Sequence, residues 1–151
     1  MIYLNEAKLT DLGAIKELTH IYGKDPVTEA HFNHRDIAIQ AREEEGRLVG
    51  FIWAGLMAKN TIAYVGDLFV HPDVKNRKVG FKLCAMMLCK LLEKGVQTSI
   101  GFIEQNQYHD RSAINCLKTS MGSTGIPCTM LYSDRERALK TLEELKSLGM
   151  V

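Results

Sequence analysis

The apolar and polar positions along the chain predict alternating strands and helices. Residues 2–7 form the first predicted strand. The next segment carries apolar residues at the spacing of one helical face, namely Leu12, Ile15, Leu18 and Ile21. Thr10 and Asp11 precede this face and supply capping oxygens, and Gly23 ends the helix.

A second helix is predicted to begin at Asp25 and Pro26, because Asp is a good cap and Pro fits the first helical turn. Three strands follow this helix. Residues 37–42 alternate apolar and polar side chains, and residues 47–57 form a mostly apolar partner strand, which together predict a hairpin. Residues 61–70 are apolar enough to lie inside the sheet.

The second half of the chain continues the alternation of helices and strands. Its predicted elements are a helix over 79–93, a strand over 97–103, a helix over 110–121, a strand over 126–132 and a helix over 134–148. No repeat or linker interrupts the order β-α-α-β-β-β-α-β-α-β-α, which predicts one α/β domain over residues 1–151. The leucines of the last helix either pack on this domain or form the seam of a homodimer.

Composition and charge narrow the classes of protein that fit. Hydrophobic residues make up 46% and charged residues 25% of the chain, which excludes a disordered protein. The net charge of +1 gives no basic field, so we expect no nucleic-acid partner. The apolar runs are far shorter than the roughly 18 residues of a membrane span. Residues 1–10 lack the apolar stretch of a signal peptide, so we expect a cytoplasmic protein with no membrane partner.

Neither the cysteines nor the histidines indicate a cross-linked or metal-bound framework. The four cysteines form no C-x-x-C pair, and we expect Cys84 and Cys89 to be reduced and buried in the helix over 79–93. His31 and His34 are three residues apart, but no third ligand follows at a suitable spacing. We therefore expect no metal site.

The segment 67–83 carries the clearest functional pattern. A strand ends at Val70, Pro72 makes a turn and a helix opens near Val79, where unpaired N–H groups and the positive end of the helix dipole suit a phosphate. Four cations surround this helix start: Lys75, Arg77, Lys78 and Lys82. Cations oppose the dipole at this end, so their crowding indicates a bound anion, and a solvated basic loop is the alternative. Gly80 lets the backbone approach the anion closely.

This segment resembles the acetyl-CoA motif of the GNAT N-acetyltransferases. In that family a strand ends in V-x-P, and Q/R-x-x-G-x-G/A then opens a helix. Val70-His71-Pro72 fits the strand end, and residues 75–80 fill the six loop positions. Lys75 stands for Gln or Arg and Gly80 for the last Gly, but Lys78 stands where the first Gly is expected. If that position needs a positive φ, a Lys there costs about 1 kcal/mol.

The resemblance extends over most of the chain and implies a fold, a co-substrate and an acceptor. It implies a mixed, largely antiparallel central sheet flanked by helices. Acetyl-CoA would donate an acetyl group to a primary amine of a small molecule or protein, held partly by the segment 11–40. The implied CoA-binding residues are Leu68, Phe69 and Val70 for the pantetheine, and Lys75, Asn76, Arg77, Lys78, Val79, Gly80 and Phe81 for the pyrophosphate.

Two residues are implied as catalytic. Many family members carry E-D-L-x-V on this strand; here Gly66 replaces the Glu, and Asp67 keeps the second position as the candidate general base. Lys118 replaces the usual Tyr and is the candidate acid for the departing thiolate. Asp67 has a structural alternative, a strand-end carboxylate satisfied by its neighbours. The missing Gly, Glu and Tyr leave a second function open, a non-catalytic GNAT-like binding or structural protein similar to those encoded by phages.

Overall fold

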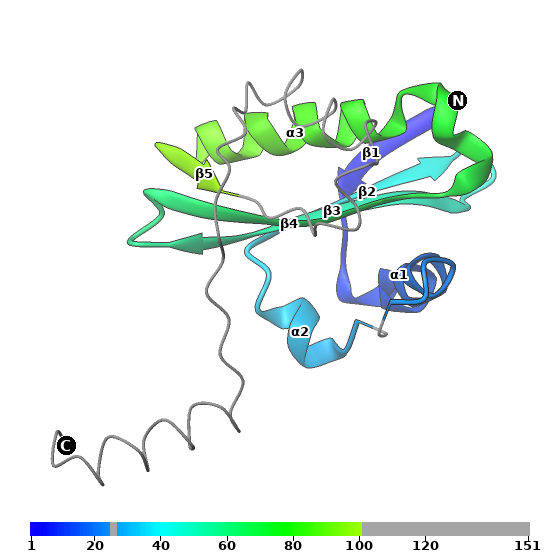
Figure 1. The fold of residues 1–151 in the computed structure, drawn as a ribbon, viewed down its shortest axis with the longest axis horizontal. Coiled ribbons are helices and arrows are strands. Elements are labelled where there is room, and N and C mark those ends of the chain that lie inside the picture. The colour runs from blue at the N-terminus through cyan, green and yellow to red at the C-terminus, as the bar shows by residue number, and fades with distance from the viewer. Residues whose placement is uncertain (25–26, 101–151) are drawn as a thin grey trace, which may run out of the picture.

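A five-stranded sheet lies at the centre of the computed structural model, which describes residues 1–24 and 27–100 (Figure 1). Its strands are β1 (Ile2–Glu6), β2 (Ile37–Glu43), β3 (Leu48–Met57), β4 (Ile62–Val70) and β5 (Thr98–Ile100), side by side in that order. The first three neighbouring pairs are antiparallel, whereas β4 and β5 are parallel. The expected mixed, largely antiparallel sheet is therefore confirmed.

Helices cover both faces of this sheet (Figure 1). α3 (Val79–Glu93) lies along one face, and α1 (Leu12–His20) and α2 (Glu29–Asn33) lie on the other. Two short 3-10 turns, η1 (Leu9–Asp11) and η2 (Pro72–Arg77), precede α1 and α3. Within the described residues, no helix is long and apolar enough to cross a membrane.

Two apolar clusters hold the layers together. The cluster between the sheet and α3 includes the buried side chains of Ile39, Ala41, Ile52, Ala54, Leu83 and Met87. The cluster on the opposite face includes Ile15, Leu18, Phe32, Phe51 and Phe69. Gly50 lets α3 approach β3, because a Cβ on Gly50 would lie 2.8 Å from Leu83 Cδ1 and 3.0 Å from Val79 Cγ1. The first turns of α3 are therefore fixed directly over the sheet.

The elements expected from the sequence agree closely with the structure up to residue 100. α3 has the expected bounds, and β1 to β4 differ from the expected strands only at their end residues. β5 is the described part of the strand expected over 97–103. The helix expected over 110–121, the strand over 126–132 and the helix over 134–148 lie outside the described residues.

The second helix begins later than expected. Asp25 and Pro26, its expected start, lie outside the described residues, and α2 spans only Glu29–Asn33. The Asp-Pro signal fits a helix start locally, but it does not specify where the helix begins when the chain must still cross to β2. α2 therefore contributes a single short turn, which carries Phe32 into the apolar cluster on its face of the sheet.

Asp11 does not cap α1 with its side chain, in contrast to the expectation. Its carboxylate accepts hydrogen bonds from the N–H of Lys8 (2.7 Å), from Gln40 Nε2 (2.8 Å) and from Arg42 (2.8 Å). Both distant partners lie on β2. A charge-assisted bond to Arg42 and a bond to Gln40, which is 3% exposed, outweigh a local cap.

The two described cysteines differ in environment. Cys84 is buried against the sheet, as expected, whereas Cys89 is exposed, so the expectation that Cys89 is buried is wrong. Leu92 on the same helix is also exposed, at 63%. α3 packs on one layer only, and residues that face away from the sheet have no cover among the described elements.

Candidate functional site

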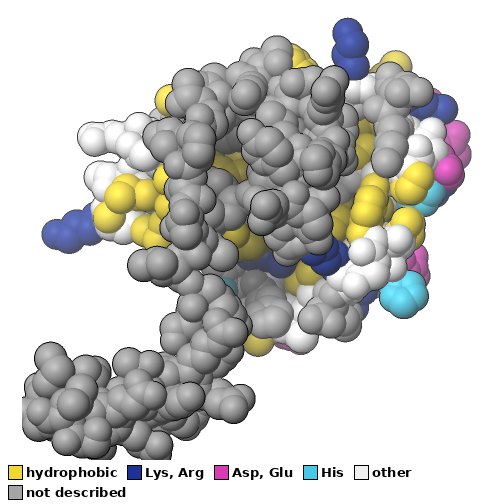
Figure 2. All heavy atoms as spheres, in the orientation of Figure 1, with side chains coloured by type: hydrophobic (Ala, Val, Ile, Leu, Met, Phe, Trp, Pro, Cys, Tyr) yellow, Lys and Arg dark blue, Asp and Glu magenta, His cyan; other side chains and the backbone are white. Residues whose placement is uncertain are grey.

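β4 leads into α3 through a tight turn at one end of the sheet. The N–H of His71 donates to the carbonyl of Val49 (2.8 Å), which ends the pairing of β4 with β3. η2 follows, and Lys78 then adopts a left-handed backbone conformation with φ 58° and ψ 25°. Figure 2 shows acidic, basic and histidine side chains gathered at this end of the molecule.

Lys78 has a positive φ at the position where the motif has Gly, so the Lys at this position costs free energy. A non-glycine residue in the left-handed region costs about 1 kcal/mol, because its Cβ approaches the following carbonyl oxygen. Lys78 is one of four non-glycine residues with positive φ in the described part of the chain; the other three form the β3–β4 turn at Ala58, Lys59 and Asn60. The strained position is therefore at the expected phosphate loop.

The first amides of α3 have no acceptor within the helix. The first bond of the α-helical ladder runs from the N–H of Lys82 to the carbonyl of Lys78 (3.0 Å). The N–H groups of Val79, Gly80 and Phe81 precede this bond and have no acceptor within the helix. No side chain caps the helix start. These three amides and the positive end of the helix dipole can bind a phosphate.

Arg77 pairs with β2 and does not point at the helix start. Its guanidinium lies 2.8 Å from Glu43, which also pairs with Arg47 at 2.7 Å, and Arg47 reaches Asp73 at 3.2 Å. The hydrogen bond from Arg47 is the main cause that holds the pKa of Glu43 below its usual value, and the charges of Arg47 and Arg77 add to it. These ion pairs fix η2 to the β2–β3 hairpin.

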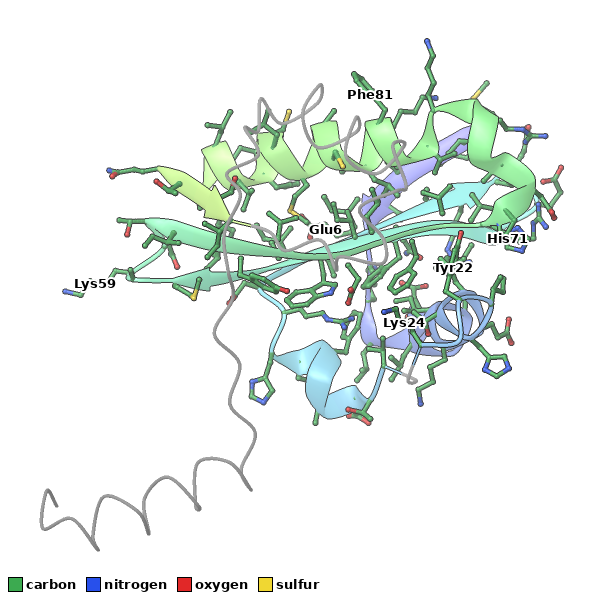
Figure 3. All side chains as sticks on the ribbon, in the orientation of Figure 1. Glu6, Tyr22, Lys24, Lys59, His71 and Phe81 are labelled. Carbon is green, nitrogen blue, oxygen red and sulfur yellow. The ribbon has the colours of Figure 1, made fainter. Side chains whose placement is uncertain are left out.

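Lys78 and Lys82 are the described cations that remain near the helix start. Neither forms an ion pair within the part of the chain that the structure describes. The side chains of Lys75 and Asn76 are outside the description. Phe81 is 39% exposed and points away from the sheet (Figure 3), so its contribution to this site is its amide.

The outer edge of β4 presents backbone groups next to this turn. Ile52 pairs with Leu68 and Gly50 with Val70, at positions where the backbone groups of β4 face away from β3. β5 pairs with β4 only at residues 62–64 within the described chain. The N–H and C=O groups of Leu68 and the N–H of Val70 therefore lie on an edge that an extended ligand can join.

The carbonyl of Val70 on that edge accepts a hydrogen bond from the hydroxyl of Tyr22. Tyr22 follows the end of α1, and its ring packs against Phe69 with the ring centroids 5.7 Å apart. Figure 3 shows Tyr22 reaching from the end of α1 toward the sheet. Nothing in the sequence pattern around Tyr22 indicated this contact, because the two partners are far apart in the chain.

β4 carries a bulge in its middle. Ile52 is opposite Leu68, but Ala54 is opposite Val65, so Trp53 of β3 faces both Gly66 and Asp67. A Cβ on Gly66 would lie 2.0 Å from Cε2 of Trp53, which means that the indole occupies the space of any side chain at that position. The residue that the motif gives as Glu is therefore excluded by a neighbouring aromatic ring.

The comparisons with known proteins assign the family. Residues 10–122 match the model of the acetyltransferase (GNAT) family. The chain belongs to this family. No curated protein matches the sequence significantly. The family assignment agrees with the left-handed turn, the uncapped helix and the open strand edge described above.

Solved GNAT structures share the fold at low sequence identity. AAC(6')-Iy, solved with the bisubstrate analogue CoA-S-monomethyl-acetylneamine, has a TM-score of 0.68 and 16% identity, covering 89% of this chain and 99% of its own. A GNAT protein of Streptococcus pneumoniae has a TM-score of 0.64 and 20% identity, with the same coverage. A ribosomal-protein-alanine N-acetyltransferase of Brucella melitensis has a TM-score of 0.64, 19% identity and the same coverage.

Asp67, the candidate base of this GNAT protein, is exposed on the bulge. Its carboxylate makes no hydrogen bond or ion pair within the described residues, so the structural alternative, a satisfied strand-end carboxylate, has no support there. Burial is the main cause that raises the pKa of the nearby Tyr64, and the charge of Asp67 adds to it. Lys118, the candidate acid, lies outside the described residues.

Arg35 and Trp53 are site residues that the sequence did not indicate. The guanidinium carbon of Arg35 lies 4.7 Å from the centre of the Trp53 ring and 5.3 Å from that of Phe51. Arg35 Nη1 and Trp53 Nε1 are both buried and have no hydrogen-bond partner among residues 1–24 and 27–100. Burial lowers the pKa of Arg35, and the charge of Asp67 opposes this effect. A basic group thus lies close to the candidate base in this GNAT protein.

The described residues contain no group of three His, Cys, Asp or Glu side chains that could hold a metal ion. His34, one of the two histidines considered from the sequence, lines a surface hollow of about 450 Å³ with Asp36, Tyr64 and Ile100. The side chain of His31 is outside the description. The acetyl-CoA motif therefore remains the basis for assigning chemistry to this chain.

Proposed function

We propose that this GNAT protein transfers the acetyl group of acetyl-CoA to a primary amine of a small molecule or protein. The observation that carries the proposal is the left-handed turn at Lys78, which leads into the start of α3 beside an edge of β4 that no described strand pairs beyond Tyr64. A phosphate and an extended amide chain are the two chemical features that this combination accommodates, and CoA has both.

The CoA-binding residues then divide into backbone and charge contributions. The amides of Val79, Gly80 and Phe81 donate to the pyrophosphate, and Lys78 and Lys82 balance its charge. The edge groups of Leu68 and Val70 bind the pantetheine as an added strand. Arg77 was expected to bind the pyrophosphate, but it pairs with Glu43 and positions η2. The other cations then balance the charge of the phosphate.

The transfer itself is a direct attack by the amine on the thioester. The nitrogen of the neutral amine bonds to the carbonyl carbon, the C–S bond breaks, and the thiolate leaves. Asp67 takes a proton from the amine, directly or through one water, and we propose Lys118 as the donor of a proton to the thiolate. Orientation of the two substrates on the β4 edge supplies much of the remaining rate.

Two observations favour the rival, a GNAT protein that binds a ligand without catalysis. The indole of Trp53 excludes a carboxylate at Gly66, and Lys78 retains backbone strain at the phosphate loop. Both observations concern positions at which this chain differs from the GNAT motif. The rival function keeps the fold and predicts no acetyl transfer to any amine.

Binding and turnover together test the proposal. Acetyl-CoA that binds only the folded protein raises its melting temperature, by an amount that grows with ligand concentration. We expect this shift with acetyl-CoA and with CoA, and release of free thiol when an amine panel is added. A shift without thiol release from any amine supports the rival, and no shift at millimolar acetyl-CoA contradicts CoA binding by the α3 turn.

A further inference from the structure

The β4 bulge brings an acidic residue and a basic residue to the same tryptophan. Asp67 lies on the bulge opposite Trp53, and the guanidinium of Arg35 lies over the Trp53 ring at 4.7 Å. Asp67 influences Arg35 electrostatically but makes no ion pair with it. The cluster therefore combines an acidic and a basic side chain that do not pair with each other among the described residues.

Two buried donors in this cluster have no acceptor. Arg35 Nη1 and Trp53 Nε1 are buried, and neither makes a hydrogen bond within the part of the chain that the structure describes. Stacking on Trp53 and Phe51 holds the guanidinium in place, but the faces of aromatic rings do not satisfy its N–H groups as an oxygen would. Buried donors of this kind are unfavourable unless an acceptor reaches them, and a bound ligand is one source of such an acceptor.

Arg35 also lines a hollow of about 440 Å³, whose walls include Phe32, Asp36, Ala38, Glu6 and Lys90. The acids in its wall already have partners. Lys90 pairs with Glu6 at 3.0 Å and with Glu93 at 3.6 Å. Asp36 accepts a hydrogen bond from the N–H of Leu56 at 2.6 Å. Arg35 is thus a cation in this wall without an acidic partner among the described residues.

We propose that the acceptor amine also carries a carboxylate, which binds Arg35 and Trp53 Nε1 while the amine meets Asp67. This inference rests on the proposed acetyl transfer and names its substrate class, a small amino acid. A planar carboxylate matches the fork of an arginine. A phosphate monoester fits the same fork, but its higher charge is disfavoured so close to Asp67.

Matched acceptors test this class directly. The acceptors are an amino acid, its carboxamide, the amine that lacks the carboxyl group, and an aminoalkyl phosphate of similar length, each assayed by thiol release at saturating acetyl-CoA. A site that leaves buried donors unpaired discriminates strongly against analogues that lack the acceptor group. We expect kcat/KM for the amino acid to exceed that for the carboxamide by about 100-fold.

Arg35→Met keeps the unbranched stem of the side chain on the two rings and removes its charge. We expect this variant to lose most of the preference for the amino acid over its carboxamide, with KM for acetyl-CoA unchanged. Arg35→Lys, which keeps the charge without the fork, should retain part of the preference. Lys59→Gln removes one charge at the exposed β3–β4 turn and should change neither value. Circular dichroism confirms that each variant is folded.

The outcomes separate this inference from the function on which it rests. Equal turnover of the amino acid, the carboxamide and the simple amine contradicts the carboxylate but leaves acetyl transfer intact. Preference for the aminoalkyl phosphate overturns the choice of carboxylate. An unchanged preference in Arg35→Met removes Arg35 from the site. No transfer to any of these acceptors or to a wider amine panel, with acetyl-CoA bound, overturns the proposed function and the inference with it.

Discussion

The indole of Trp53 fills the space that a side chain on Gly66 would need, with Cε2 only 2.0 Å from where its Cβ would lie. The two residues face each other across the β3–β4 bulge. A large ring on one strand and a bare backbone on the other form one packing unit, so neither residue is free to change alone. The absence of the motif's carboxylate at this position is therefore a packing requirement of this chain.

Gly66→Ala should lower the free energy of unfolding by about 1–3 kcal/mol, because the added methyl group overpacks against the indole. Gly55→Ala is the matched control on β3, since its Cβ would meet nothing closer than 3.9 Å. Urea denaturation of both variants measures the difference. In a Trp53→Ala background, Gly66→Ala should cause little further loss in the free energy of unfolding. If the losses of the two single variants simply add in the double variant, the two residues do not form a packing unit.

Lys78→Gly should raise the free energy of unfolding by about 1 kcal/mol, because glycine adopts the left-handed conformation without a Cβ clash. Lys82→Gly provides the opposite control: within α3 a glycine should lower stability by about 1 kcal/mol. Lys78→Ala separates charge from backbone, because it removes the ammonium and keeps the strain. Denaturation curves give the free energy of unfolding of the three variants. A Lys78→Gly variant less stable than the parent would argue against the left-handed turn.

Asp67→Asn should reduce kcat by about 100-fold or more, as expected for loss of a general base, with little change in the affinity for acetyl-CoA. The substitution keeps the size of the side chain, and the exposed position makes a packing effect small. Steady-state kinetics from pH 6 to 9 with the best acceptor provide the measurement. A kcat within about twofold of the parent across this range would exclude Asp67 as the base.

Glu43→Gln should flatten the loss of stability at acid pH. Arg47 and Arg77 lower the pKa of Glu43 in the folded protein, so the unfolded chain binds the proton more readily. This contribution is fully present above the unfolded value of about 4.3 and is lost as the pH falls through the lower folded value. Melting temperatures between pH 2 and 7 should show a shallower acid limb for Glu43→Gln than for the parent. Glu45→Gln, at an exposed turn, should follow the parent curve.

The elements that depend on local periodicity could be predicted from the sequence. α3 was bounded correctly because its apolar positions, its cationic start and its preceding Pro72 all act within a few residues. The turn from β4 into α3 could be predicted for the same reason. The hydrogen bonds of Asp11 could not be predicted locally, because its partners are on β2. The start of α2 could not be predicted either, because it depends on how the chain crosses to the sheet.

The packing inside the site depends on contacts between residues far apart in the chain, which a local sequence pattern does not predict. Trp53 reaches Gly66 through a bulge whose register is set by strand pairing, and Arg35 reaches Trp53 from the connection between α2 and β2. In the sequence, Gly66 indicates only that the carboxylate expected from the motif is absent. The structure shows that the position is instead filled from the neighbouring strand.

The hydrogen bond from Tyr22 to the carbonyl of Val70 joins the segment expected to hold the acceptor to the strand edge proposed for the pantetheine. An acceptor that moves the end of α1 also moves a donor on that edge, and a ligand on the edge acts back on α1. If the acceptor contacts this segment, binding of one substrate changes the affinity for the other. The factor by which acetyl-CoA changes the affinity for the acceptor must equal the factor by which the acceptor changes the affinity for acetyl-CoA. A single tyrosine hydroxyl would thus impose cooperativity on a reaction between two separate molecules.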